Sequence, residues 1–214
     1  LPIYKLRFTS HYASIAKKAH QRASLILRCF KCRNPVFLTK TYLVYVRPLL
    51  EYCSPVWSPV YIKDIALLEF VQRWFTKRIT GMNDLKYLQR LETLNLETLE
   101  SRRLKTDLIT MFKILNNLID IDFYNFFSLS TVANTRCHRF KLIKPVCKSN
   151  IRLFSFSCRR IDCWNSLPEN LVNCKSLHEF KSRLNSVNFS KHLILTFWFG
   201  SKSFYFYCSF IFLL

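Results

Sequence analysis

The sequence predicts a mainly α protein: a helical bundle followed by a small, mixed, basic C-terminal unit and an aromatic tail. Half of the 214 residues are hydrophobic, a composition that favours a packed core over a disordered chain. Apolar residues recur every three or four positions through most of the first 120 residues, which is the period of a helix face. Gly81 and Gly200 are the only glycines. This scarcity excludes the glycine-rich phosphate loops of classical nucleotide-binding enzymes.

The first helix is expected over residues 11–30, with one apolar and one basic face. Ser10 is available as its N-cap. The apolar face consists of Tyr12, Ala16, Ala19, Ala23, Ile26 and Phe30. At ~100° per residue, the basic residues fall on the other side of the helix: they are Lys17, Lys18, Arg22 and Arg28. Because no acidic residue interrupts them, we favour contact with phosphate over a merely solvated face.

Four further helices complete the expected bundle, over residues 35–49, 64–80, 85–94 and 97–118. Pro35 suits the first turn of its helix, and Pro48 interrupts that helix near its end. Gly81 is expected to end the next one as a left-handed cap. The residues expected to be buried along the last helix are Leu104, Leu108, Met111, Leu115 and Leu118.

The pattern changes after about residue 120. Residues 1–120 form the expected helical domain, 121–135 a linker, 136–190 the small basic unit, and 191–214 the tail. Two short helices are expected in the basic unit, over residues 154–165 and 176–187. Ser176 and Glu179 match a capping box at the start of the second.

The net charge of +20 is distributed unevenly. Residues 1–50 carry ten Lys/Arg and no Asp or Glu, whereas residues 51–100 are nearly balanced. A one-sided field attracts polyanions, most commonly nucleic acid, although solubility and an anionic membrane surface are alternatives. Basic clusters among aromatic residues favour salt-sensitive backbone contact without sequence reading. The candidate nucleic-acid contacts are Lys17, Lys18, Arg22, Arg28, Arg73, Lys77, Arg78, Arg102, Arg103, Arg136, Arg139, Lys141, Arg159 and Arg160.

The nine cysteines do not form a legible disulfide framework, and we expect them to be reduced in an intracellular compartment. Cys29 and Cys32 have metal-ligand spacing, but no second pair follows closely. A four-ligand zinc set can be written from Cys158, Cys163, Cys174 and His178. Because Cys163 lies on an apolar helix face, where a thiol acts as a small hydrophobe, we expect no metal or other cofactor in this chain.

No catalytic residue is expected. Asp120 and Asp122 form an isolated Asp-x-Asp just past a helix end, where a turn is commoner than a metal site.

The end of the chain, residues 193–214, has nine aromatic residues among 22 and Lys202 as its sole charge. It is long enough to span a bilayer, but a charge at the centre of a membrane is costly. We therefore expect a translated non-coding or frame-shifted end rather than a membrane anchor. Met82 and Met111 are the only methionines, so we also expect the chain to be a fragment or an incomplete gene model.

Three stretches of the first 120 residues occur in order: "TYLVYVRPLLEYCSPVWSP", "DIALLEFVQRWFTKRITG" and "LQRLETLNLETLESRRLKTDLITMFKILNNL". They resemble the region after the palm in LINE-type, jockey-like non-LTR retrotransposon reverse transcriptases. The later stretch "TRCHRFKLIKPVCKSNIRLFSFSCRRIDCWNSLPENLVNCKSLHEFKSRL" is similar to the C-terminal end of the same proteins. The resemblance covers roughly residues 8–187.

The resemblance implies that the chain belongs to the thumb and its extension, which close over template and primer. Members of that family carry upstream fingers and a palm, where an Ala-Asp-Asp box helps to hold the catalytic divalent metals. This chain has no Asp-Asp pair, so no catalytic residue can be transferred to it. The partners implied are an RNA template, an RNA–DNA hybrid or DNA, and the missing palm and fingers. The location implied is the nucleus or a cytoplasmic ribonucleoprotein.

The stretch from Arg47 to Pro59 is expected to be a structural corner of the bundle. Its prolines break the helix and turn the chain, so that Tyr52 and Trp57 can wedge between helices. Arg47 and Glu51 are four residues apart and can form an ion pair. The residues with expected structural roles are Arg47, Pro48, Glu51, Tyr52, Pro55, Trp57, Pro59 and Trp164.

Two other functions stay open at this point. One is an independent helical nucleic-acid-binding protein derived from such an element. The other is a basic membrane-associated protein anchored by residues 193–214, although we do not expect a membrane partner.

Overall fold

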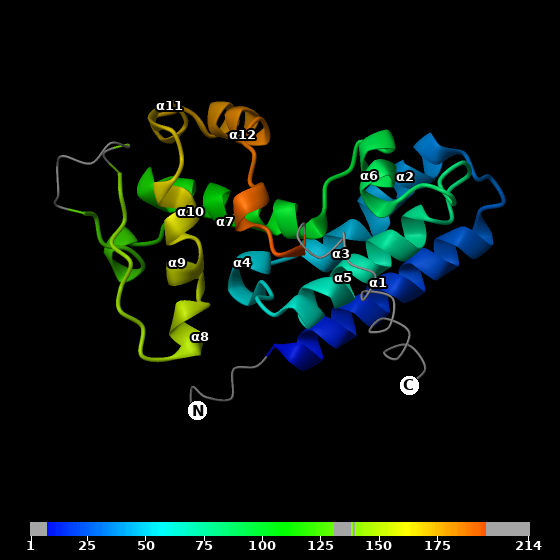
Figure 1. The fold of residues 1–214 in the computed structure, drawn as a ribbon, viewed down its shortest axis with the longest axis horizontal. Coiled ribbons are helices and arrows are strands. Elements are labelled where there is room, and N and C mark those ends of the chain that lie inside the picture. The colour runs from blue at the N-terminus through cyan, green and yellow to red at the C-terminus, as the bar shows by residue number, and fades with distance from the viewer. Residues whose placement is uncertain (1–7, 131–137, 139, 196–214) are drawn as a thin grey trace. The chain divides into compact units, whose positions relative to one another are not determined.

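A computed structural model describes residues 8–130, 138 and 140–195, and confirms the mainly helical class (Figure 1). The described chain forms two compact units. The first comprises residues 8–102 together with 193–195, and the second comprises residues 103–192. The division falls inside one long helix, after Arg102, whereas the sequence pattern placed a boundary near residue 120.

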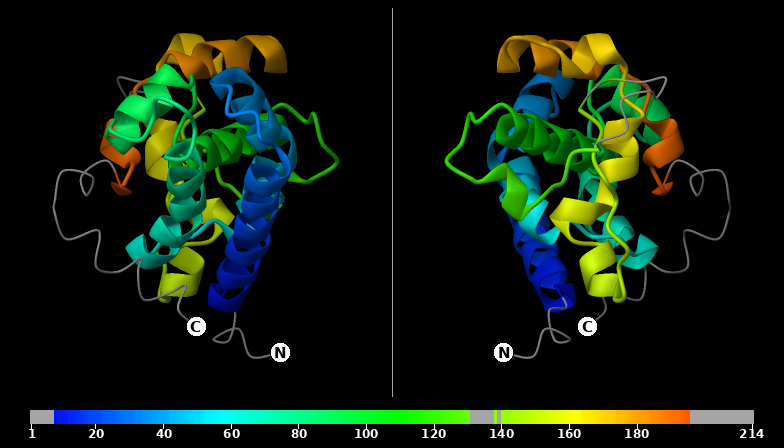
Figure 2. Two further views of the ribbon diagram at one scale, coloured as in Figure 1. Left: turned by 90° about the vertical axis from the view of Figure 1, so that its right-hand side faces the viewer. Right: turned by 90° about the vertical axis from the view of Figure 1, so that its left-hand side faces the viewer.

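The first unit is built from six helices and the start of a seventh. They are α1 (Thr9–Cys29), α2 (Pro35–Tyr45), α3 (Arg47–Glu51), α4 (Ser54–Trp57), α5 (Ile62–Thr76), α6 (Tyr87–Thr93) and the first turn of α7 (Leu99–Leu115). Figure 2 gives two further views of these elements.

The small residues of α1 allow it to pack closely on α5. Ala16, Ala19 and Ala23 are almost fully buried, as the apolar period predicted, in one core with Leu68 and Val71 of α5. A face without bulky side chains lets two helix backbones approach, so larger side chains from the partner fill the space between them.

The beginning and end of α1 differ from the prediction. Ser10 lies inside the first turn, and Phe8 occupies the N-cap position without a side-chain cap bond. Phe30 follows the helix and is exposed, with its ring against that of Phe37. Both expectations for these residues were therefore wrong, because the helix begins and ends slightly earlier than its apolar pattern.

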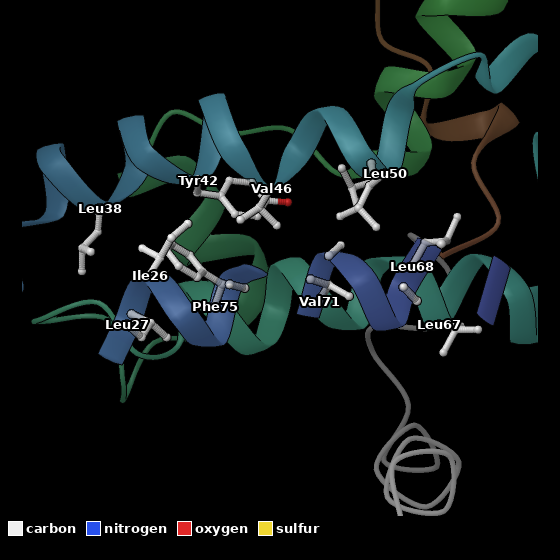
Figure 3. Packing of buried hydrophobic residues seen from close by; sticks show 14 of the residues in the cluster. Ile26, Leu27, Leu38, Tyr42, Val46, Leu50, Leu67, Leu68, Val71 and Phe75 are labelled. Atoms are coloured by element: carbon white, nitrogen blue, oxygen red, sulfur yellow. The ribbon is translucent and has the colours of Figure 1, made fainter. Parts of the chain in front are cut away.

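The predicted break near Pro48 is confirmed. Asn34 caps α2 by accepting hydrogen bonds from the amides of Val36 and Phe37, and α2 ends at Tyr45. Pro48 lies in the first turn of α3, where its missing N–H costs no helical hydrogen bond. The apolar stripe nevertheless continues across the break as Leu38, Tyr42, Val46 and Leu50, facing α5 (Figure 3).

Two helix ends were predicted too far along the chain. Helix α5 ends at Thr76, and Gly81, at φ +78°, lies in the turn beyond it instead of capping it. Helix α7 ends at Leu115, which leaves Leu118 exposed. Asn117 supplies the left-handed residue there, at φ +52°, and the Leu118 amide donates to the Lys113 carbonyl.

A buried carboxylate joins three helices of the first unit. Glu69 of α5 is fully buried and accepts hydrogen bonds from the Tyr87 hydroxyl of α6 and from the amide of Leu99, the first residue of α7. Burial, followed by the charge of Glu69, raises the pKa of Tyr87 well above its usual value. The phenol therefore stays protonated and acts as a donor.

Gln72, one turn after Glu69, extends the same network. Its Oε1 accepts from the Tyr42 hydroxyl at 2.9 Å. Its Nε2 donates to the Tyr87 hydroxyl and to the Glu97 carbonyl, each at 2.9 Å. Since satisfied buried polar groups demand one geometry, the network fixes how α2, α5 and α6 meet.

The second unit continues from α7 through short helices. They are the 3₁₀ helix η2 (Phe123–Asn125), α8 (Asn150–Leu153), α9 (Phe156–Arg159), α10 (Ile161–Asn165), α11 (Glu169–Val172), α12 (Leu177–Asn185) and the 3₁₀ helix η3 (Ser190–His192). The helix predicted over residues 154–165 is instead α9 and α10, separated at Arg160. An antiparallel bridge joins Leu129 and Leu142.

Trp164 lies at the centre of the second unit. It is fully buried, and its indole N–H donates to the Phe140 carbonyl at 3.0 Å. Phe180 of α12 packs against it and stacks on Phe112 of α7 at 4.2 Å between ring centroids. The expected Ser176 cap is present: the Ser176 hydroxyl accepts from the Glu179 amide.

Replacing Glu69 with alanine should lower the free energy of unfolding of the first unit by about 3 kcal/mol, because two buried donors lose their acceptor. Urea denaturation measures the loss. Glu92→Ala, on the exposed surface of α6, is the control, and its effect should stay within about 0.5 kcal/mol. Equal effects in the two variants would contradict the role assigned to Glu69.

Candidate nucleic-acid interface

The four basic side chains predicted on α1 are exposed. In the described part of the chain, no carboxylate lies within ion-pairing distance of Lys17, Lys18, Arg22 or Arg28. At 3.6 residues per turn, Lys17 and Arg28 share one flank of the helix, and Lys18 and Arg22 share the other. Helix α1 therefore presents positive charge across its solvent-facing side, and these four residues are called the basic ridge of α1.

The first unit removes much of its negative charge from the surface. Asp64, Glu69 and Glu100 are buried. Glu100 accepts hydrogen bonds from the amides of Ile194 and Leu195, which anchors that segment to the first unit. Glu51 pairs with Arg47 and Arg102. The exposed surface of this unit is consequently more basic than its composition indicates.

The end of α5 carries two more exposed candidates, Lys77 and Arg78. The guanidinium of Arg78 lies over the Trp74 indole, 3.8 Å from the ring centroid, and its Nη1 donates to the Trp74 carbonyl at 2.9 Å. Arg73 is half-buried, and its guanidinium lies over the Tyr87 ring. Arg73 therefore contributes to packing, while Lys77 and Arg78 extend the basic surface.

The side chains of Arg102 and Arg103 stabilise the fold and do not face a ligand. Arg102 donates to the Glu51 carboxylate through both Nε and Nη2, the latter at 3.0 Å. This hydrogen bond raises the pKa of Arg102, against the opposing effect of burial. Arg103 is 2% exposed. The expectation that these two residues contact phosphate is thus corrected, because each side chain is held within the fold.

Arg159 and Arg160 are likewise committed to an internal carboxylate. Asp107 of α7 is fully buried, with Arg159 Nη2 at 2.7 Å and Arg160 Nε at 3.1 Å. A buried carboxylate needs such partners, since an unpaired charge in the interior is strongly unfavourable. We therefore reassign both arginines from phosphate contact to the stability of the second unit.

The remaining candidates lie around residue 138. Lys141 is half-buried, whereas Arg136 and Arg139 fall outside the described residues. His138 is buried, and its Nε2 lies 3.1 Å from the Trp164 carbonyl. Burial lowers the pKa of His138, so that it contributes no charge near neutral pH.

The corner between α3 and α5 depends on Trp57 and not on Tyr52. Trp57 is buried; its indole N–H donates to the Tyr52 carbonyl at 2.8 Å, and its own carbonyl accepts from the Tyr12 hydroxyl at 2.7 Å. The Tyr52 side chain is 78% exposed, so the expectation that it wedges between helices was wrong. The backbone carbonyl of Tyr52 is the part of this residue that holds the corner.

The other corner residues form the turn itself. Arg47 and Glu51 approach to 3.7 Å, as their spacing predicted. Pro55 lies in the first turn of α4, and Pro59 is buried. Cys53 is left-handed at φ +52°, a conformation that its residue type gave no reason to expect.

Two residues that the sequence pattern did not single out lie beside the basic surface. Trp74 precedes Arg78 by four residues, a spacing from which their stacking could have been predicted. His20 of α1 lies with its ring 4.3 Å from that of Trp74, and only the packing of α1 on α5 reveals this contact.

The cysteines and aspartates do not assemble a metal site in the part of the chain that the structure describes. The Cys147 and Cys158 sulfurs lie 3.7 Å apart without a third ligand. Burial raises the pKa of the Cys163 thiol to about 12, so this residue stays protonated. The Asp122 side chain accepts from the Tyr124 amide and caps η2, which supports the interpretation of Asp120–Asp122 as a turn.

Among the described residues, no helix combines the length and the apolar character that crossing a bilayer requires. Residues 196–214 of the aromatic tail lie outside the described part of the chain.

The chain is similar to a protein of Caenorhabditis elegans, Uncharacterized protein B0403.1, with 29% identity over 134 residues. That stretch covers 61% of this chain and 65% of the relative, so the chain spans less than two thirds of the relative's length. No family model matches the chain, and no solved structure matches it.

Arg159→Gln should lower the free energy of unfolding of the second unit by about 3 kcal/mol, because Asp107 is left buried and short of a partner. Thermal or urea denaturation measures this change. Lys17→Gln, on the exposed ridge of α1, should stay within about 0.5 kcal/mol of the wild type. Comparable losses of stability in both variants would remove the distinction between structural and exposed basic residues.

Tyr12→Phe should destabilise the first unit by about 1 kcal/mol, since it deletes the hydrogen bond to the Trp57 carbonyl. Tyr52→Phe is the matched control, because the same atom is removed from an exposed ring. Its unfolding free energy should equal that of the wild type within about 0.5 kcal/mol. A larger effect at Tyr52 than at Tyr12 would contradict the assignment of the corner.

Proposed function

We propose that this chain is the post-palm part of a LINE-type reverse transcriptase, where it binds template and primer but performs no catalysis by itself. The observation that carries the proposal is the exposed basic ridge of α1, whose four cations face no carboxylate partner in the described chain. The resemblance of the ordered sequence stretches supplies the class of enzyme. Lys77 and Arg78 extend the same surface.

The length of the ridge suits a nucleic-acid backbone. Lys17 and Arg28 are separated by about 16 Å along the helix axis at ~1.5 Å per residue. Each strand of a duplex carries one phosphate per ~3.4 Å of duplex axis, so the ridge is long enough to contact several of them. Lysine and arginine on a rigid helix contact backbone without reading bases, which suits a protein that grips any template.

By the resemblance, the chemistry of polymerisation takes place in another part of the enzyme. Carboxylates that hold divalent metal belong to a palm that precedes the matched region in that family. The basic residues of this chain bind nucleic acid: their charges neutralise phosphates and release counterions, while the α1–α5 core holds them in place.

An independent nucleic-acid-binding protein derived from such an element is the second candidate. It is favoured by the satisfied network around Glu69 and Gln72, which gives the first unit a core of its own. Sequencing the transcript and locus upstream of Leu1 separates the two candidates. An open frame encoding a palm with its Ala-Asp-Asp box supports the polymerase fragment, whereas a stop codon or unrelated sequence supports the independent binder.

Replacing all four ridge residues with glutamine should weaken binding to an RNA–DNA hybrid and flatten its salt dependence. The slope of log affinity against log salt should decrease by roughly 0.7 to 0.9 for each phosphate that the variant no longer neutralises. Fluorescence anisotropy titrations at several salt concentrations measure both quantities. The four substitutions are Lys17→Gln, Lys18→Gln, Arg22→Gln and Arg28→Gln.

A control of equal charge removes four exposed lysines of the second unit: Lys148→Gln, Lys175→Gln, Lys181→Gln and Lys191→Gln. It should retain nearly the wild-type slope. If the slope of the α1 variant is unchanged, or if the slopes of both variants decrease by the same amount, α1 is not the binding surface.

A further inference from the structure

One cluster on the first unit combines a stacked arginine, an indole and an imidazole. Trp74 of α5 has the Arg78 guanidinium over its ring and the His20 ring 4.3 Å away, tilted by 55°. His20 also stacks on Phe70 at 6.2 Å between ring centroids. The cluster therefore joins the middle of α1 to the last turn of α5.

The stack holds Arg78 in place while leaving part of it available. Its Nη1 donates to the Trp74 carbonyl at 2.9 Å, and the residue as a whole is exposed. In the described chain no carboxylate forms an ion pair with it. A guanidinium fixed on an aromatic face loses little further freedom on binding, and its remaining N–H groups suit the oxygens of a phosphate.

His20 adds a titratable group beside that guanidinium. Burial, followed by the positive charge of Arg78, lowers the pKa of His20, so the imidazole is neutral at pH 7. On α1, Lys17 lies three residues earlier on the same flank. From α5 and the turn after it, Arg78 is a charged group that acts on His20, while Phe70 and Trp74 pack against its ring and are neutral.

We propose that Arg78, held on Trp74 beside the ring of His20, forms a docking point for one phosphate of a nucleic-acid backbone. The ligand class rests on the proposed function; the position and the pH dependence go beyond it. A bound phosphate neutralises the local positive charge, which favours protonation of His20. Binding should therefore tighten as pH falls through the pKa of His20, because the imidazolium then adds a second cation to Arg78.

The arrangement favours phosphate over a stacked base. Arg78 already lies over the indole, so the ring of Trp74 serves to position the cation. What the cluster offers to a ligand is positive charge with hydrogen-bond donors, which is complementary to a phosphate oxygen.

Anisotropy titrations of the full chain with an RNA–DNA hybrid test the docking point. Arg78→Gln should weaken binding roughly tenfold and reduce the salt slope by the equivalent of about one phosphate. Arg78→Lys keeps the charge but removes the planar guanidinium that stacks on Trp74. This variant should have an intermediate affinity and the wild-type salt slope. Lys40→Gln removes one exposed charge from α2 and should leave both quantities near the wild-type values.

The pH dependence provides a readout that a merely structural role would not change. Because the pKa of His20 is lowered, the window lies below the ordinary histidine range: from about pH 7 to about pH 5, wild-type affinity should rise more than that of His20→Gln, since only the wild type gains the imidazolium charge. Circular dichroism at each pH checks that the variants are folded. Equal pH profiles in the two proteins would overturn the role of His20.

The outcomes separate this inference from the proposed function. If Arg78→Gln matches the wild type in affinity and slope while the four-residue α1 variant is weakened, the docking point is overturned and the proposed function stands. If the wild type shows no salt-dependent binding, both are overturned. A slope that decreases in Arg78→Gln and is retained in Lys40→Gln supports the docking point.

Discussion

The first unit depends on the burial of one carboxylate. Glu69 lies in an apolar core, and a charge there is tolerated because the Tyr87 hydroxyl and the Leu99 amide both donate to it. Its position fixes the entry of α7 and the approach of α6 to α5. Gln72, one turn later, forms hydrogen bonds with the Tyr42 hydroxyl and the Glu97 carbonyl and so joins both to the same network.

The burial and pairing of acidic groups also determine the charge of the surface. Because Glu69, Asp64 and Glu100 are buried and Glu51 is paired with arginine, few carboxylates remain to neutralise the exposed lysines and arginines of the first unit. In the second unit, Asp107 takes Arg159 and Arg160 out of the basic surface. The fold thus sorts the arginines into structural and exposed groups, and the proposed binding surface is formed by the second group.

Sequence periodicity predicted the helices well where one face is buried along its whole length. The alanines of α1 and the stripe from Leu38 to Leu50 follow this rule, and the break at Pro48 follows from the missing amide. Helix ends were less predictable. Gly81 and Leu118 were placed within or next to helices that stop earlier, because local capping competes with the apolar period.

The sequence by itself determined the helical class, the basic character and the position of the α1 ridge, because these depend on residue type and spacing along one helix. Only the tertiary structure decided which arginines are available. Arg102 and Arg159 occur in basic clusters like those of Lys17 and Arg78, yet each meets a carboxylate about fifty residues away in the chain. The contact between His20 and Trp74 is also tertiary, since it requires α1 to pack on α5. Such pairings are set by three-dimensional packing, for which spacing in the sequence carries no signal.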